Sequence, residues 1–177
     1  MKERTFSLRR VAQLRAVTAL LWAVGLITAL GTDPDGAAPV PTVVALLLVA
    51  YPLIDALSSA VEARRSRDPL PIANGLISLA ASVALAVVTA TADAGAALAV
   101  FGVWAVVSGV VLLGAALRRR RAGSRELPMI VSGGVSALAG LSFVAGSTQA
   151  VAHLSMLAGY ATAGAVLYLI WSVRAGR

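Results

Sequence analysis

Two polar stripes at helical spacing stand out from a mostly apolar sequence: Asp55, Ser58, Ser59 and Glu62, followed by Asn74, Ser78 and Ser82. Asp55 is the acidic residue among them that lies well inside an apolar stretch. A carboxylate costs about 2.5–3.5 kcal/mol at the centre of a membrane helix, so such residues mark candidate functional sites. Two interpretations stay open: Asp55 hydrogen-bonds to the second stripe and joins two helices, or it takes up and releases a proton.

His153 is the sole histidine of the chain, and we expect it inside the last apolar segment, a turn beyond Gln149. Imidazole groups gain a proton in mildly acidic solution, so His153 could sense acid; the ordinary alternative is a hydrogen-bonded residue at the membrane interface. A direct pair with Asp55 is not expected. Their depths, measured from opposite membrane faces, leave a gap of about 10 Å in a core of ~30 Å.

Four consecutive arginines close the fourth apolar segment: Arg118, Arg119, Arg120 and Arg121. They set the membrane orientation, and they could also bind anionic lipid headgroups. Trp22 and Trp104 are expected to pack between helices, and Trp171 to mark the interface. The sequence has no cysteine, zinc-ligand spacing, phosphate-binding loop or nucleophile–base pair. We therefore predict neither an enzyme nor a cofactor or metal site.

Membrane helices must position these residues. Of the 177 residues 59% are hydrophobic, more than a soluble domain of this size can bury. Six apolar segments, each suited to a hydrocarbon core of ~30 Å, are predicted over residues 16–30, 41–61, 70–90, 96–117, 127–145 and 150–173. The sequence thus predicts an all-α polytopic membrane protein, with a basic arm over residues 1–15 and one membrane domain over 16–177. A cleaved signal peptide is the less favoured interpretation of the first segment.

All 15 Lys and Arg residues fall on one side of the six predicted spans. Because cytoplasmic loops are enriched in these residues, both termini are predicted to be cytoplasmic and the protein to reside in the inner (plasma) membrane of the cell. This placement explains the net charge of +7 without nucleic acid. The expected partner is the lipid bilayer, anionic lipid in particular, and homo-oligomerisation stays open.

The spans share an internal register. In the even-numbered spans, four residues separate each aromatic residue from a polar or small one: Tyr51 and Asp55, Trp104 and Ser108, Tyr160 and Gly164. In two odd-numbered spans, Gly75-x-x-Ser78-x-x-x-Ser82 matches Gly133-x-x-Ser136-x-x-x-Gly140. Such repetition indicates one supersecondary unit stacked against copies of itself. We predict three helical-hairpin repeats, over residues 16–61, 70–117 and 127–173.

The segments FGVWAVVSG, ALRRRR and PMIVSGGVSALAG, echoed by YPLIDALSS and EARRS, carry a family resemblance. The chain resembles the HdeD-type bacterial acid-resistance membrane proteins, which contain a short membrane-hairpin repeat. The resemblance implies an inner-membrane, six-span protein linked to survival at low pH, and it supplies no catalytic residues. We expect a non-catalytic protein of the acid-stress or membrane-integrity type. The alternative is a small channel or proton-coupled transporter that uses Asp55.

Overall fold

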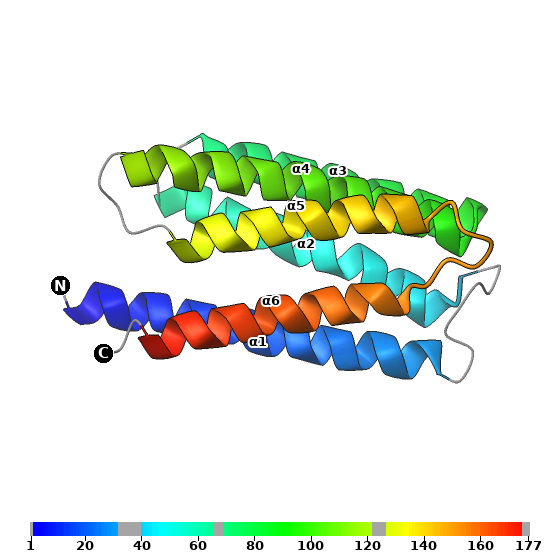
Figure 1. Cartoon of the computed structure of the whole chain (residues 1–177), viewed down its shortest axis with the longest axis horizontal. Helices are drawn as coiled ribbons and strands as arrows, with labels where there is room; N and C mark the ends of the chain where they lie inside the picture. The colour runs from blue at the N-terminus through cyan, green and yellow to red at the C-terminus, as the bar shows by residue number, and fades with distance from the viewer. Residues whose placement is uncertain (1, 32–39, 66–68, 122–126, 175–177) are drawn as a thin grey trace.

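The computed structural model describes residues 2–31, 40–65, 69–121 and 127–174 (Figure 1). Their regular secondary structure is six α-helices: α1 Lys2–Leu30, α2 Thr42–Arg65, α3 Leu70–Thr91, α4 Ala94–Arg121, α5 Leu127–Gly146 and α6 Ser155–Arg174. The predicted all-α fold is confirmed for this part of the chain.

Four of the helices are long and apolar enough to cross a membrane. Their apolar spans are Thr42–Arg64, Leu70–Thr91, Ala94–Arg118 and Met129–Gly146. The apolar parts of the other two helices are shorter, Ala16–Leu30 in α1 and Ser155–Leu167 in α6. Large apolar side chains such as Leu21, Leu46 and Leu138 are exposed on the outside of the bundle. A helical protein with this surface is a membrane protein, because lipid rather than water must cover it.

Local sequence sets several helix ends. Pro69 and Pro71 open α3, where a missing backbone N–H has no cost. The Asp93 carboxylate accepts a 2.8 Å hydrogen bond from the Ala96 N–H and caps α4. Gly31 ends α1 with a left-handed φ of 61°, and its N–H donates to the Ile27 carbonyl.

One helix boundary differs from expectation. Residues 2–15, predicted as a basic arm that leads into the first span, are helical and continue into the first apolar segment as the single helix α1. The last helix was expected from residue 150, but α6 begins at Ser155. The delay has a local cause, because Ser147 Oγ and Thr148 Oγ1 donate to the Val144 and Ala145 carbonyls at the end of α5. These bonds favour a turn over immediate helix resumption.

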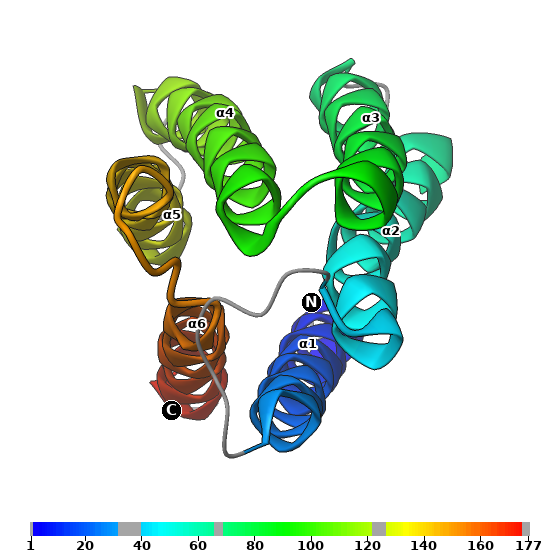
Figure 2. The ribbon, with the colours of Figure 1, turned by 90° about the vertical axis from the view of Figure 1, so that its right-hand side faces the viewer.

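The helices lie in chain order around a ring, so that α1 also contacts α6 (Figure 2). The most extensive packing joins the antiparallel neighbours α2 and α3, α4 and α5, and α1 and α6; the α1–α2 and α5–α6 interfaces are small. The predicted hairpins pair each odd helix with the even helix after it. In the structure, each even helix instead packs most closely on the next odd helix, with α1 following α6 around the ring.

Glycines bring α4 and α5 into backbone contact. A Cβ atom added at Gly102 would lie 2.8 Å from the Gly140 carbonyl oxygen, and one at Gly109 would lie 2.7 Å from that of Gly133. Real Cβ atoms do not approach other atoms so closely, so these positions require glycine. Gly134 on the same helix meets nothing within 4 Å and carries no such requirement.

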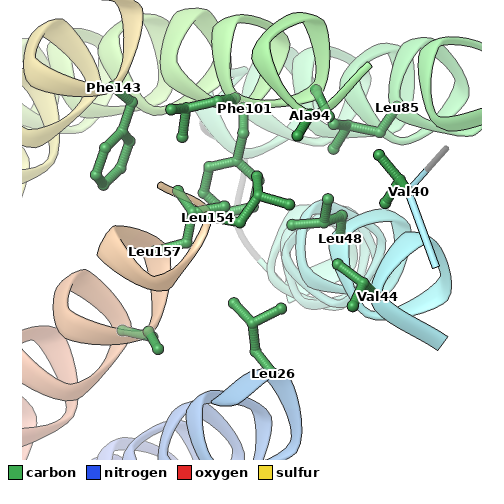
Figure 3. Close-up of a cluster of buried hydrophobic side chains, with 14 of the residues drawn as sticks. Leu26, Val40, Val44, Leu48, Leu85, Ala94, Phe101, Phe143, Leu154 and Leu157 are labelled. Atoms are coloured by element: carbon green, nitrogen blue, oxygen red, sulfur yellow. The ribbon is translucent and has the colours of Figure 1, made fainter. Parts of the chain in front are cut away.

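The hydrophobic core lies toward the end of the bundle where α1 ends and α4 begins. Figure 3 shows Leu26, Leu48, Leu85, Phe101 and Leu157 converging there from five helices. Leu30 at the end of α1, Ala94 at the start of α4 and Val40 just before α2 belong to the same cluster. This core joins the helix pairs at one end of the bundle. The polar stripe of α2 lies closer to the other end.

Candidate functional site

Asp55 joins α2 to α3 through one of its carboxylate oxygens. Asn74 Nδ2 and Ser78 Oγ each donate a hydrogen bond to Asp55 Oδ2, both at 2.8 Å. Asn74 Nδ2 also donates to Ser59 Oγ at 3.0 Å. The two polar stripes therefore face each other. They do so because α2 and α3 are consecutive antiparallel helices, and helical periodicity keeps each stripe on one side.

Trp104 extends this network to α4. Its indole Nε1 donates to Ser78 Oγ at 3.0 Å, and both residues are buried, Ser78 completely. An indole N–H can only donate, so the Ser78 oxygen accepts this bond and its own proton goes to Asp55. The direction of the hydroxyl is thereby fixed, and three helices meet at one serine.

The other carboxylate oxygen of Asp55, Oδ1, has a different environment. Within the described part of the chain, Oδ1 accepts no hydrogen bond and Asp55 forms no ion pair. Asp55 is half-buried. Because Oδ2 already accepts two hydrogen bonds, Oδ1 is the oxygen that would carry a proton or meet a cationic group.

The remaining residues of the predicted stripes play separate parts. Ser58 Oγ bonds within its own helix, to the Ile54 carbonyl at 2.8 Å, and Glu62 is exposed. Ser82 Oγ reaches across to the Val49 carbonyl of α2 at 3.2 Å. Only Asn74 and Ser78 contact the carboxylate itself.

Pro52 lies inside α2, close to two backbone carbonyls that accept hydrogen bonds from other helices. A proline inside a helix has no N–H, so the carbonyl four residues earlier loses its usual donor. Side chains from two other helices hydrogen-bond to the carbonyls on either side of that position. Trp22 Nε1 donates to the Leu47 carbonyl at 2.7 Å, and Ser82 donates to that of Val49. Two other helices thus hydrogen-bond to α2 about two turns before Asp55.

Aromatic side chains from five helices form a layer beside the polar network: Trp22, Tyr51, Phe101, Trp104, Phe143 and Tyr160. Phe101 is fully buried, with its ring against Trp22, Tyr51, Trp104 and Phe143. Neighbouring ring centroids lie between 4.5 and 6.3 Å apart. These rings pack the interior of the helix ring at this level. Trp22 and Trp104 therefore pack between helices, as expected; the side chain of Trp171 lies outside the described residues.

A second polar contact joins α5 to α6. Ser136 Oγ and Tyr160 OH lie 2.8 Å apart. In the predicted register Ser136 matches Ser78 and Tyr160 matches Trp104, so α4 and α6 each present an aromatic polar group to a serine on the preceding odd helix. Ser108 matches Asp55, and its buried hydroxyl has no hydrogen-bond partner in the described structure.

The aromatic-to-serine contact is the part of the site that sequence reasoning missed. Its signal was present, since both residue pairs occupy matching positions of the repeat. Nothing in the sequence, however, indicated that these two repeat positions touch.

His153 lies two residues before α6 begins and is exposed, so its expected position inside the last helix is wrong. The turn held by Ser147 and Thr148 accounts for this difference. The His153 carbonyl accepts the Met156 N–H at 3.2 Å, in the turn that leads into α6. The structure does not bring His153 to Asp55.

The arginine run ends α4 at the same end of the bundle as both chain termini (Figure 1). Arg118, Arg120 and Arg121 are exposed, and none of the three forms an ion pair or side-chain hydrogen bond in the described structure. The side chain of Arg119 lies outside the described residues. Three guanidinium groups are therefore available to an external anion.

Among the described residues, no three His, Asp or Glu side chains come together in a way that could hold a metal ion. No protein-family model, curated protein or solved structure matches this chain.

Proposed function

We propose that this chain is a six-span protein of the bacterial inner membrane with both termini in the cytoplasm. The four long apolar helices support membrane insertion, and α1 and α6 pair with each other within the same ring. The placement of every Lys and Arg on one side of the spans supports the orientation. We also propose that residues 2–30 stay in the mature protein, because α1 packs extensively against α6.

Single cysteines test this topology, because the native chain has none. A membrane-impermeant thiol reagent applied to intact cells should label cysteines at the exposed positions Ala92 and Gln149, and leave one at Arg121 unlabelled. Labelling at Arg121, or protection at either other position, would contradict the six-span arrangement.

We further propose that the six helices are three repeats. The matching contacts Trp104 with Ser78 and Tyr160 with Ser136 support this proposal. So does the helix pairing, in which each even helix has the following odd helix as its main partner. A closed ring of three such pairs repeats the same pairing of even and odd helices three times.

The function that this geometry supports best is non-catalytic: a protein that contributes to membrane integrity during acid stress. The proposal that the protein is non-catalytic rests on the role of Asp55 in joining helices. Its carboxylate accepts hydrogen bonds from Asn74 and Ser78, and Ser78 accepts one from Trp104. A carboxylate engaged in this way joins three helices. The link to acid stress comes from the family resemblance of the sequence.

Acid survival is the direct test. Cells that lack the protein should survive low pH less well than cells that produce it. Asp55→Asn should restore survival, because an amide oxygen can accept both hydrogen bonds. Survival should be normalised to the amount of folded protein in the membrane. Equal survival with and without the protein would contradict the acid-stress function.

A small channel or proton-coupled transporter is the second candidate function, and the open oxygen Oδ1 of Asp55 favours it. Such a mechanism requires Asp55 to exchange a proton, which asparagine cannot do at any pH. Under this hypothesis Asp55→Asn folds normally but abolishes both acid survival and proton flux in reconstituted vesicles. Full activity of that variant would end the proton-linked hypothesis.

Anionic lipid is the partner that we propose for the arginines of α4. About 20 residues cross a ~30 Å hydrocarbon core, so a helix that enters at Ala94 places Arg118–Arg121 in the opposite headgroup layer. Replacing Arg118, Arg120 and Arg121 together by Gln should weaken retention of phosphatidylglycerol, but not phosphatidylcholine, in native mass spectra. Equal retention of both lipids by the native protein would contradict this contact.

A further inference from the structure

The Asp55 carboxylate carries a charge that no described basic residue balances. Its hydrogen bonds from Asn74 and Ser78 both end on Oδ2, and Oδ1 has neither a hydrogen bond nor an ion pair. Ionised groups removed from water are ordinarily paired with an opposite charge, because hydrogen bonds alone do not replace their hydration. Asp55 is half-buried, so other protein groups do not fully enclose its carboxylate.

A second polar group without a partner lies at the same level of the bundle. The rings of Tyr51 and Trp104 meet edge-on with centroids 5.9 Å apart. Asp55 follows Tyr51 by one helical turn on α2, and Ser108 follows Trp104 by one turn on α4. Because α2 and α4 run in the same direction, both residues lie just beyond the same aromatic pair. The buried Ser108 hydroxyl is unpartnered there.

The oxygen atoms and aromatic rings near Asp55 suit an organic ammonium ion better than a metal ion. A hard metal ion needs about six oxygen ligands, and the described residues offer few that are free. Asp55 Oδ2 accepts two hydrogen bonds, and Ser78 Oγ is occupied by its bonds to Trp104 and Asp55. An organic ammonium ion needs only one carboxylate and the faces of aromatic rings. Trp104 and Tyr51 provide the rings, and Asp55 provides the charge.

We propose that Asp55, with Tyr51, Trp104 and Ser108, forms a binding site for a small organic ammonium ion. The Oδ1 oxygen faces the cationic nitrogen, the aromatic rings contact its alkyl groups, and Ser108 accepts a hydrogen bond from any N–H. Asn74 and Ser78 hold the carboxylate in place from its other side. This inference goes beyond the acid-stress function and stands without it, because binding is measured on the purified protein.

Tryptophan fluorescence tests the proposal, since Trp104 is part of the site. The full-length protein in lipid nanodiscs is titrated with tetraethylammonium chloride at constant total chloride, with sodium chloride making up the difference. We expect a saturable fluorescence change. Asp55→Asn should weaken apparent binding by at least about tenfold, because it removes the charge and keeps the acceptor for Asn74 and Ser78. Asp55→Glu should retain binding.

Glu62→Gln is the matched control. Glu62 lies on the same helix but is exposed, so its loss should leave the titration unchanged. An equal loss in Glu62→Gln and Asp55→Asn would assign the response to general surface charge and overturn the proposal. No saturable response in the native protein would also overturn it, and would leave proton binding as the use of the open oxygen. Retained binding in folded Asp55→Asn would exclude this site.

Discussion

The pairs α2–α3 and α4–α5 are both antiparallel and joined by short connections, yet different contacts hold them together. In α4–α5, glycines at 102, 109, 133 and 140 allow backbone to touch backbone. In α2–α3, Asp55, Asn74 and Ser78 form side-chain hydrogen bonds, and a Cβ atom added at Gly75 would lie 3.3 Å from Ser59 Cβ, a less demanding distance. Where no hydrophobic effect drives helices together, both close packing and polar contacts are available.

We infer from this difference that the α4–α5 pair contributes mainly to stability, whereas the α2–α3 pair carries the groups that can bind a proton or a ligand. In α4–α5 the two backbones approach so closely at the glycines that no side chain fits between them. The polar pair α2–α3 has one carboxylate oxygen without a hydrogen bond, and Ser78 links the other oxygen to Trp104 of the aromatic layer. We therefore expect substitutions in α4–α5 to act on folding, and those in α2–α3 to act more on function.

The largest expected effect is that of Gly140→Val. The new side chain would meet the Gly102 and Val106 backbone at or below 2.6 Å, so the helices must separate. We expect a loss of about 3 kcal/mol or more, at the upper end of overpacking effects. Thermal unfolding in detergent measures it. Gly134→Val on the same helix, where the added atoms meet open space, is the control and should change stability by less than about 0.5 kcal/mol. Similar losses in both variants would show that the close approach is unimportant.

A smaller effect is expected for Asp55→Leu. This change removes the acceptor for Asn74 and Ser78 and should cost about 1 kcal/mol, since hydrogen bonds between membrane helices average ~0.6 kcal/mol. Glu62→Leu, at an exposed position of α2, is the comparison in the same unfolding measurement. A loss as large as that of Gly140→Val would remove the distinction between the two pairs.

Trp104→Phe should have a still smaller effect of about 0.6 kcal/mol. Phenylalanine keeps most of the aromatic packing but cannot donate to Ser78. The Ser78 hydroxyl then becomes free to turn away from Asp55. A double-mutant cycle with Ser78→Ala isolates the bond: if the two losses simply add, the hydrogen bond contributes nothing to stability.

The smallest effect, with the opposite sign, is expected for Ser108→Ala. It removes a buried hydroxyl that has no partner, so stability should stay level or rise slightly, by at most about 0.5 kcal/mol. Ser108 on α4 occupies the repeat position that matches Asp55 on α2. Ser108→Ala and Asp55→Leu therefore compare matching positions in the α4–α5 and α2–α3 pairs. A clear loss of stability in Ser108→Ala would indicate that this hydroxyl has a partner after all.

The features of this protein that could be predicted from its sequence are those that depend on interactions within a few residues. Apolar length, prolines near helix starts and Asp93 as a cap determine the helices, because each acts within a few residues. The facing stripes of α2 and α3 were also predictable, since a short connection between antiparallel helices leaves little freedom in how they meet. The one-sided distribution of Lys and Arg can likewise be read without a structure.

Tertiary structure alone decided the rest. The pairing of α1 with α6, the bond from Trp104 to Ser78 and the six-ring aromatic layer join residues far apart in the chain. In a membrane helix both the lipid-facing and the inward-facing sides are apolar, so periodicity does not reveal which side packs. The place of His153 outside α6 depended on two hydroxyl groups that hydrogen-bond to the α5 backbone. Contacts between residues far apart in the chain therefore could not be predicted from the sequence, because they depend on how the helices pack in the folded protein.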